Sequence, residues 1–163
     1  RRVEEVALEI AGRKDLDNAY VLQQIEGWQR MAHKAPQWAA TEGIVYPPRL
    51  ALEQCSGQRA AAYNAETVKR LLNPKERHLM ADITAGMGVD FSYGGPLFEK
   101  AVYVERKGEF VETARLSMPL LGVDNADFIG GNHRAIDCQH SILRQHQLQV
   151  GRGLCIRMEQ RES

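Results

Sequence analysis

The fold is decided by the stretch Asp82-Ile-Thr-Ala-Gly86-Met-Gly88-Val-Asp90. The apolar run of residues 79–83 leads into this stretch and predicts a buried parallel strand that ends in a glycine turn. Glycine allows a left-handed backbone and lets backbone N–H groups come close to a ligand. A Gly-x-Gly turn alone is common in proteins, so its meaning depends on the segments around it.

The downstream segments predict a doubly wound α/β sheet. Residues 101–105 and residues 126–129 each predict a further strand. Between them, residues 109–121 predict an amphipathic helix with Gly122 as its stop. Strands and helices that alternate at this spacing predict an α/β, Rossmann-like core with about three parallel strands.

The upstream segments predict helices. Residues 3–10 have helical spacing, and Asp17 is the predicted N-cap of a second helix that ends before Pro36. A third helix is predicted over residues 57–72, with Ser56 as its N-cap.

The chain divides into three predicted parts. Residues 1–75 form a helical N-terminal subdomain with a connector, in which the periodicity fails over residues 37–54 and Pro47-Pro48 exclude regular helix. Residues 76–132 form the first half of the Rossmann-like domain. Residues 133–163 form an atypical polar tail, rich in Gln, Arg and His.

The tail has a weak pattern. A helix over residues 135–150 is one option, and beyond it only residues 154–156 have the apolar character of a buried segment. The other apolar residues are too scattered to predict a strand. The spacing of the tail's histidines and cysteine matches no zinc site, so we expect surface side chains and no metal there: His133, Cys138, His140 and His146.

The charge balance, the cysteines and the apolar runs of the chain argue against several classes of protein. Lys+Arg and Asp+Glu both total 21, so the chain has no global basic field of the kind that favours nucleic acid. Three irregularly spaced cysteines predict a reducing compartment, the cytoplasm. No apolar run approaches the roughly 20 residues that a membrane span needs. The chain begins with Arg1-Arg2-Val3, which suggests a piece of a longer protein.

Three acidic residues surround the glycine turn and indicate the ligand. Glu105 ends the second strand about 20 residues after the turn, where a carboxylate can accept hydrogen bonds from two ribose hydroxyls. Dinucleotides and S-adenosylmethionine both fit this pattern. A pyrophosphate would be repelled by Asp82 and Asp90, and Phe91 occupies the place of the third glycine. The ammonium and sulfonium of S-adenosylmethionine would be attracted instead. In the simpler alternative, the acids are helix caps and a solvated strand end.

Together these residues resemble the first two motifs of class I methyltransferases. The chain is closer still to a bacterial methyltransferase family that carries a C-terminal THUMP-like domain, with similarity from about residue 22 to residue 132. The segments that carry this resemblance are Trp38, Gly43-Ile-Val-Tyr-Pro47, Glu53-Gln-Cys-Ser56, Tyr63, Tyr103-Val-Glu-Arg106, Ala114-Arg115 and Leu120-Leu-Gly122.

The resemblance implies a cofactor site for S-adenosylmethionine. Gly86 and Gly88 would form the loop under the cofactor, and Asp82 would lie near its amino-acid part. Glu105 would hold the ribose, Asn132 would lie near the adenine, and Gln54 would touch the methionine part. A simpler reading of Gln54 and the two residues after it is a capped helix start with a buried thiol.

The resemblance also implies methyl transfer to RNA, since THUMP-type domains accompany RNA substrates. The family places its acceptor-binding Asp-Pro motif after a fourth strand, but the last proline of this chain is Pro119. No catalytic residue is therefore assigned. A catalytically inactive cofactor-binding fragment, a methyltransferase with a small-molecule acceptor and an NAD-dependent oxidoreductase remain alternatives.

A three-stranded parallel sheet of this family leaves its central strand exposed on the edge where a fourth strand should pair. We expect either a domain less stable than a complete methyltransferase, or an edge that is covered by the tail or by a partner chain. Two copies of the chain that associate through this edge would be one way to cover it.

Overall fold

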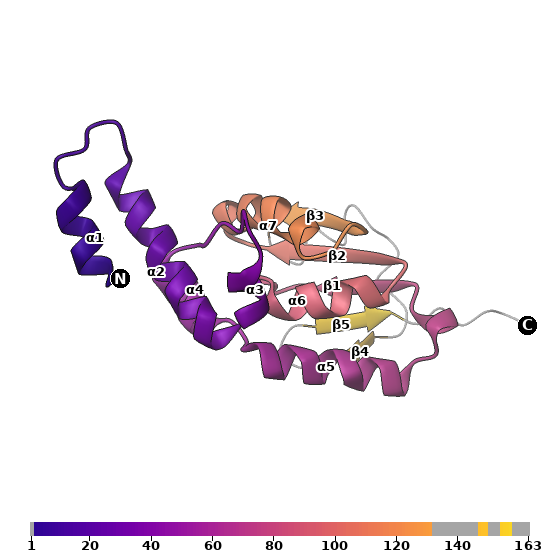
Figure 1. Ribbon diagram of the computed structural model, residues 1–163. Coiled ribbons are helices and arrows are strands. Elements are labelled where there is room, and N and C mark those ends of the chain that lie inside the picture. Colours follow the sequence, from indigo (N-terminus) through magenta and orange to yellow (C-terminus); the bar gives the residue numbers. More distant parts are fainter. Residues whose placement is uncertain (1, 132–146, 150–153, 158–163) are drawn as a thin grey trace, which may run out of the picture.

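The computed structural model describes residues 2–131, 147–149 and 154–157. A five-stranded sheet lies beside a layer of helices, and a pair of helices at the N-terminus projects away from it (Figure 1). The helices are α1 (Val3–Ile10), α2 (Asn18–Lys34), α3 (Pro36–Ala40), α4 (Arg49–Gln54), α5 (Gln58–Leu71), α6 (Val89–Gly94) and α7 (Gly108–Leu120), with 3-10 turns η1 (Pro74–Glu76) and η2 (Gly95–Leu97). The strands are β1 (Leu79–Asp82), β2 (Lys100–Glu105), β3 (Ala126–Gly130), β4 (Gln147–Gln149) and β5 (Leu154–Arg157).

The sheet has the strand order β3-β2-β1-β5-β4. Strands β1, β2 and β3 run parallel, with Asp82 beside Tyr103 and Glu105 beside Gly130. Parallel strands bring their carboxyl ends to one edge of the sheet, so the residues after β1 and β2 meet there. The predicted α/β core with three parallel strands is confirmed.

The free edge of β1 is covered by the tail. Strand β5 pairs with β1 in the antiparallel direction, from Asp82 beside Leu154 to Leu79 beside Arg157, and β4 pairs with β5. Coverage of this edge by the tail was one of the two expected outcomes. The sequence pattern did not predict the two strands themselves, and an open sheet edge supplies hydrogen-bond partners to sequences of weak pattern. The remainder of the helix suggested over residues 135–150 lies outside the described residues. Self-association through a sheet edge stays a prediction.

The N-terminal helices follow the expected order, with two corrections. Asp17 caps α2, as expected, by accepting the Tyr20 N–H at 3.0 Å. The connector region holds two short helices. Its prolines permit them, because they stand where a helix needs no backbone N–H. Pro36 begins α3, and Pro48 precedes α4. Ser56 is not the N-cap of α5. That helix begins one residue later than expected, with Gly57 as its cap.

The main hydrophobic core contains residues from before and from after residue 75 in the sequence. Trp38 and Val68 belong to the same buried cluster as Met80, Phe91 and Tyr103. Because side chains alternate along a strand, the neighbouring residues of β1 and β2 form a second, smaller cluster on the other face of the sheet: Leu79, Ala81, Val102 and Val104, with Ile129 of β3. The domain boundary near residue 75 stays a prediction.

The helix α1 lies at the periphery. It contains no buried residue, and Leu8 is exposed. None of the helices in the described part of the chain is long and apolar enough to cross a membrane.

Candidate functional site

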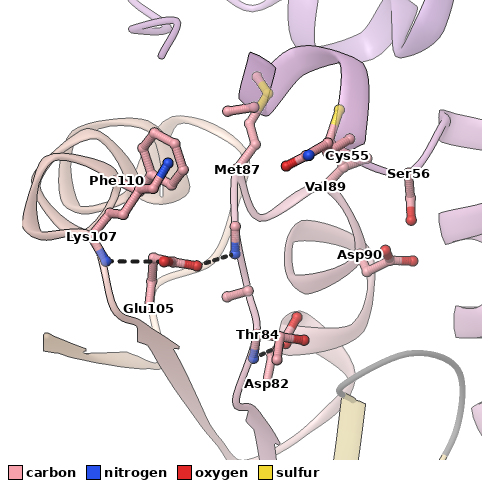
Figure 2. Close-up of a pocket in the computed structure, with 14 residues that line it drawn as sticks. Cys55, Ser56, Asp82, Thr84, Met87, Val89, Asp90, Glu105, Lys107 and Phe110 are labelled. Carbon is pink, nitrogen blue, oxygen red and sulfur yellow. Dashed lines mark hydrogen bonds between the residues drawn. The ribbon is translucent and has the colours of Figure 1, made fainter. Parts of the chain in front are cut away.

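A cavity of about 340 Å³ opens at the carboxyl ends of β1 and β2 (Figure 2). Its size is at the lower end of the range for small-molecule sites, roughly 300–1,000 Å³. The residues that line it come from α4 and the segment after it, the end of β1, the glycine loop, the start of α6, the end of β2 and the start of α7. They are Ala51, Gln54, Cys55, Ser56, Asp82, Thr84, Ala85, Gly86, Met87, Val89, Asp90, Glu105, Lys107 and Phe110.

The glycine loop forms the floor of the cavity. Gly86 and Gly88 have φ values of 56° and 91°, in the left-handed region that favours glycine. A Cβ on Gly88 would also overlap with Met118 Cε and approach Tyr103 Cε2 to 3.2 Å, whereas a Cβ on Gly86 would meet only Thr84 O at 3.8 Å. Gly88 is therefore favoured by its backbone conformation, and a Cβ there would also force the Met118 side chain to shift.

Glu105 is fixed between two backbone segments. One carboxylate oxygen accepts the Gly86 N–H at 3.0 Å, and the other accepts the Lys107 N–H at 3.0 Å. Hydrogen bonds to an ionised group are about twice as strong as those between neutral groups. These two bonds set the orientation of the carboxylate before a ligand binds. Each oxygen keeps a further lone pair that can accept a hydrogen bond from the ligand.

Asp82 is held in a different way. Its side chain is 4% exposed and accepts the Thr84 N–H at 3.1 Å. Burial raises the pKa of Asp82 to about 7, and the nearby carboxylates of Asp90 and Glu105 add to this effect, while the hydrogen bond from Thr84 opposes it. A cation beside Asp82 would favour its ionised form.

The remaining wall comes from the start of α6 and the end of α4. Asp90 lies in the first turn of α6, and Asn64 of α5 donates to its Oδ1 from Nδ2 at 3.0 Å. Gln54 ends α4, and Cys55 follows it with its Sγ donating to Leu52 O at 3.2 Å. Burial raises the pKa of the Cys55 thiol, so the thiol stays protonated and is a poor nucleophile.

Lys107 and Phe110 are among the lining residues that sequence reasoning missed. The Lys107 ammonium lies 5.0 Å from the centre of the Phe110 ring, in a cation–π contact beside Glu105. Their position just after the second strand was the available signal. Within the described ranges, no group of three His, Cys, Asp or Glu side chains is arranged to hold a metal ion.

The predicted site residues come together at this cavity. Asp82, Gly86, Asp90, Glu105 and Gln54 line it, while Gly88 lies just outside as the N-cap of α6. Asn132 lies outside the described residues, as do the histidines of the tail.

Comparisons with known proteins give one similar structure. No family model and no curated protein matches the chain. The solved structure is that of a protein named "putative methyltransferase" from Porphyromonas gingivalis W83. It has a TM-score of 0.65 and 28% sequence identity, over 82% of this chain and 35% of that one. The chain thus spans about a third of that protein, and the likeness supports a methyltransferase-type fold.

Proposed function

We propose that the cavity binds S-adenosylmethionine and that the chain is the cofactor-binding part of a methyltransferase. The observation that carries the proposal is Glu105, whose carboxylate is held at the end of β2 by the N–H groups of Gly86 and Lys107, both at 3.0 Å. Its free lone pairs suit two neighbouring hydroxyls, as in a ribose. The similar structure adds support for methyltransferase function in general.

The charges of the cavity fit a cationic ligand. Asp82 and Asp90 line the same space as Glu105, and carboxylates attract an ammonium or a sulfonium. A pyrophosphate would instead face these acids at the start of α6, where phosphate sites usually present bare N–H groups. The charge pattern therefore favours S-adenosylmethionine over a dinucleotide.

When bound, S-adenosylmethionine would supply an electrophilic methyl group. In this proposal the chain's own residues bind and orient: Glu105 accepts the ribose hydroxyls, and Asp82 with Gln54 lies toward the amino-acid part. Asn132 near the adenine belongs to the same proposal and rests on the resemblance. RNA as the methyl acceptor rests on the resemblance alone, and fold likeness does not decide a substrate.

Calorimetric titration of the purified chain with S-adenosylhomocysteine tests the cofactor proposal. Asp82→Ala and Glu105→Ala should both weaken binding. The matched control is Glu99→Ala, which removes an acid that lies outside the cavity and pairs with His78. Equal loss in the control, or stronger binding of NADH than of S-adenosylhomocysteine, would contradict the proposal.

A second assay addresses the acceptor. Transfer of tritium from labelled S-adenosylmethionine to RNA, lost in Glu105→Ala, would support RNA methylation by this chain. Cofactor binding without transfer to RNA or to small molecules would favour the inactive-fragment alternative.

A further inference from the structure

Trp38 joins α3 to α6 through a buried hydrogen bond. Its side chain is 1% exposed, and its indole N–H donates to Ser92 Oγ at 3.1 Å. A buried indole usually finds such a partner. Here the partner lies 54 positions further along the chain, on the helix that follows the glycine loop.

Ser92 transmits this contact to the wall of the cavity. Its hydroxyl donates to Val89 O at 2.7 Å, and its backbone N–H donates to Gly88 O at 2.9 Å. Val89 and the next residue, Asp90, both line the cavity. Helix α6 has only six residues, and so short a helix is unstable alone. Its position must therefore come from tertiary contacts.

Trp38 is itself fixed from the N-terminal side. Tyr46 OH donates to the Trp38 carbonyl at 3.4 Å. Gln24 of α2 binds both backbone groups of Tyr46, accepting its N–H at 2.7 Å and donating to its carbonyl at 2.9 Å. A continuous set of contacts thus runs from α2 through Trp38 to the first turn of α6.

We propose that Trp38 is a positioning residue for the cavity. Its indole N–H, acting through Ser92, holds the first turn of α6 where Val89 and Asp90 complete the wall. Trp38 does not line the cavity, so its effect on a ligand passes through Ser92. The identity of the ligand rests on the proposed function, whereas the hydrogen bonds do not depend on it.

Two variants remove the contact, and a third serves as the control. Trp38→Phe keeps an aromatic ring and removes the indole N–H, and Ser92→Ala removes the hydroxyl. Tyr93→Phe removes a second hydrogen bond between the same two helices, from Tyr93 OH to Gln37 Oε1 at 2.7 Å, which does not involve Val89.

Amide hydrogen exchange in the ligand-free chain measures how readily the first turn of α6 opens. The backbone amide at position 92 should exchange about fivefold faster in Trp38→Phe, which corresponds to the loss of one hydrogen bond of about 1 kcal/mol. Ser92→Ala also removes the hydrogen bond to Val89 O, so this amide should accelerate at least as much in that variant. The Val104 amide in β2 reports global unfolding and should change less. In Tyr93→Phe the ratio of the two exchange rates should stay as in the wild type.

Titration with S-adenosylhomocysteine then measures the effect on the ligand. Trp38→Phe should weaken binding roughly three- to tenfold, with Tyr93→Phe near the wild type. The double variant Trp38→Phe, Ser92→Ala should bind no worse than Ser92→Ala, because both changes break the same contact.

Two outcomes would overturn the inference. If Ser92 and Val104 accelerate equally in Trp38→Phe, the tryptophan has a general structural role only. If the Ser92 amide accelerates while affinity stays at the wild-type value, the turn does not control the cavity. A folded wild-type chain that binds no S-adenosylhomocysteine would refute the proposed function instead, and the exchange ratio would still decide whether Trp38 holds the turn.

Discussion

Two sides of the cavity hold carboxylates under opposite conditions. On the β2 side, Glu105 accepts two backbone N–H groups, from Gly86 and Lys107. On the β1 side, Asp82 is 4% exposed, accepts the Thr84 N–H, and has its pKa raised to about 7 by burial and by neighbouring acids. The β2 side is thus prepared by geometry, whereas the charge on the β1 side depends on a cation that would offset its burial. In the proposed function, the first side selects a ribose and the second selects a positive charge.

The largest effects on stability and ligand binding are expected from substitutions in the glycine loop, which joins the two sides of the cavity. Gly88→Ala should lower the free energy of unfolding by about 3 kcal/mol and abolish binding, because left-handed backbone strain adds to the overlap with Met118. Gly86→Ala has the strain without the overlap, so it should lower the free energy of unfolding by about 1–2 kcal/mol. Urea unfolding of both variants measures the difference. Equal losses would show that the packing around Gly88 does not matter.

Next in size is the loss of the β2-side carboxylate. Glu105→Ala should weaken S-adenosylhomocysteine binding about 100-fold, since hydrogen bonds to a charged group contribute about 1.5–3 kcal/mol each. Glu105→Gln should weaken it about tenfold or more, because the amide cannot accept from both Gly86 and Lys107. Calorimetric titration compares the two variants. A Glu105→Gln variant with wild-type affinity would argue against the role of geometry on this side.

On the β1 side we expect the free energy of unfolding to depend on pH. Between about pH 4 and pH 7 the folded chain keeps a proton on Asp82 that the unfolded chain has released. Unfolding then releases this proton, so stability falls as pH rises through this window, by up to about 1.4 kcal/mol per pH unit. Asp82→Asn should remove that slope. Urea unfolding at pH 5 and at pH 7.5 measures it, with the exposed Asp124→Asn as control, and an unchanged slope in Asp82→Asn would assign the titration to another group.

The affinity for the cofactor should also depend on the titration of Asp82, but it should rise with pH where stability falls. Because a cationic ligand favours ionised Asp82, binding releases a proton below about pH 7. Affinity for S-adenosylhomocysteine, which carries an ammonium, should therefore rise with pH up to about 7, by at most about tenfold per unit. Titrations at several pH values in buffers of different ionisation enthalpy would detect the released proton. No such release would mean that the ammonium lies away from Asp82.

The smallest effect belongs to the side chain of Lys107. Its backbone N–H binds Glu105, while its ammonium only covers the Phe110 ring at 5.0 Å. Lys107→Met keeps the backbone contact, so affinity should change by no more than about threefold, in keeping with a cation–π contact of about 0.5–1 kcal/mol. A much larger loss in titration would show that the ammonium itself contacts the ligand.

Much of the site could be predicted because parallel strands impose a simple geometry. Asp82 and Glu105 are far apart in the sequence, but each ends a strand whose neighbour is the other, so their meeting follows from the strand pattern. Asn64 could not be found in this way. Its contact with Asp90 depends on how α5 packs against α6, and no periodic signal marks that residue.

Two expectations drawn from local sequence failed. Ser56 has the chemistry of an N-cap, but α5 begins after Gly57, and Ser56 lines the cavity instead. The segments of β4 and β5 have a weak apolar pattern and become strands because β1 offers an open edge. For β4 and β5 a weak local pattern is overruled by a partner elsewhere in the chain.

The sequence by itself determined the alternation of strands and helices, the positions of the two glycines and the acids at the strand ends. These features depend on backbone freedom and on apolar spacing, which act over a few residues. Only the tertiary structure decided the raised pKa of Asp82, the pairing of β5 with β1 and the hydrogen bond from Trp38 to Ser92. Desolvation, edge pairing and buried hydrogen bonds depend on groups that meet only when distant segments pack together.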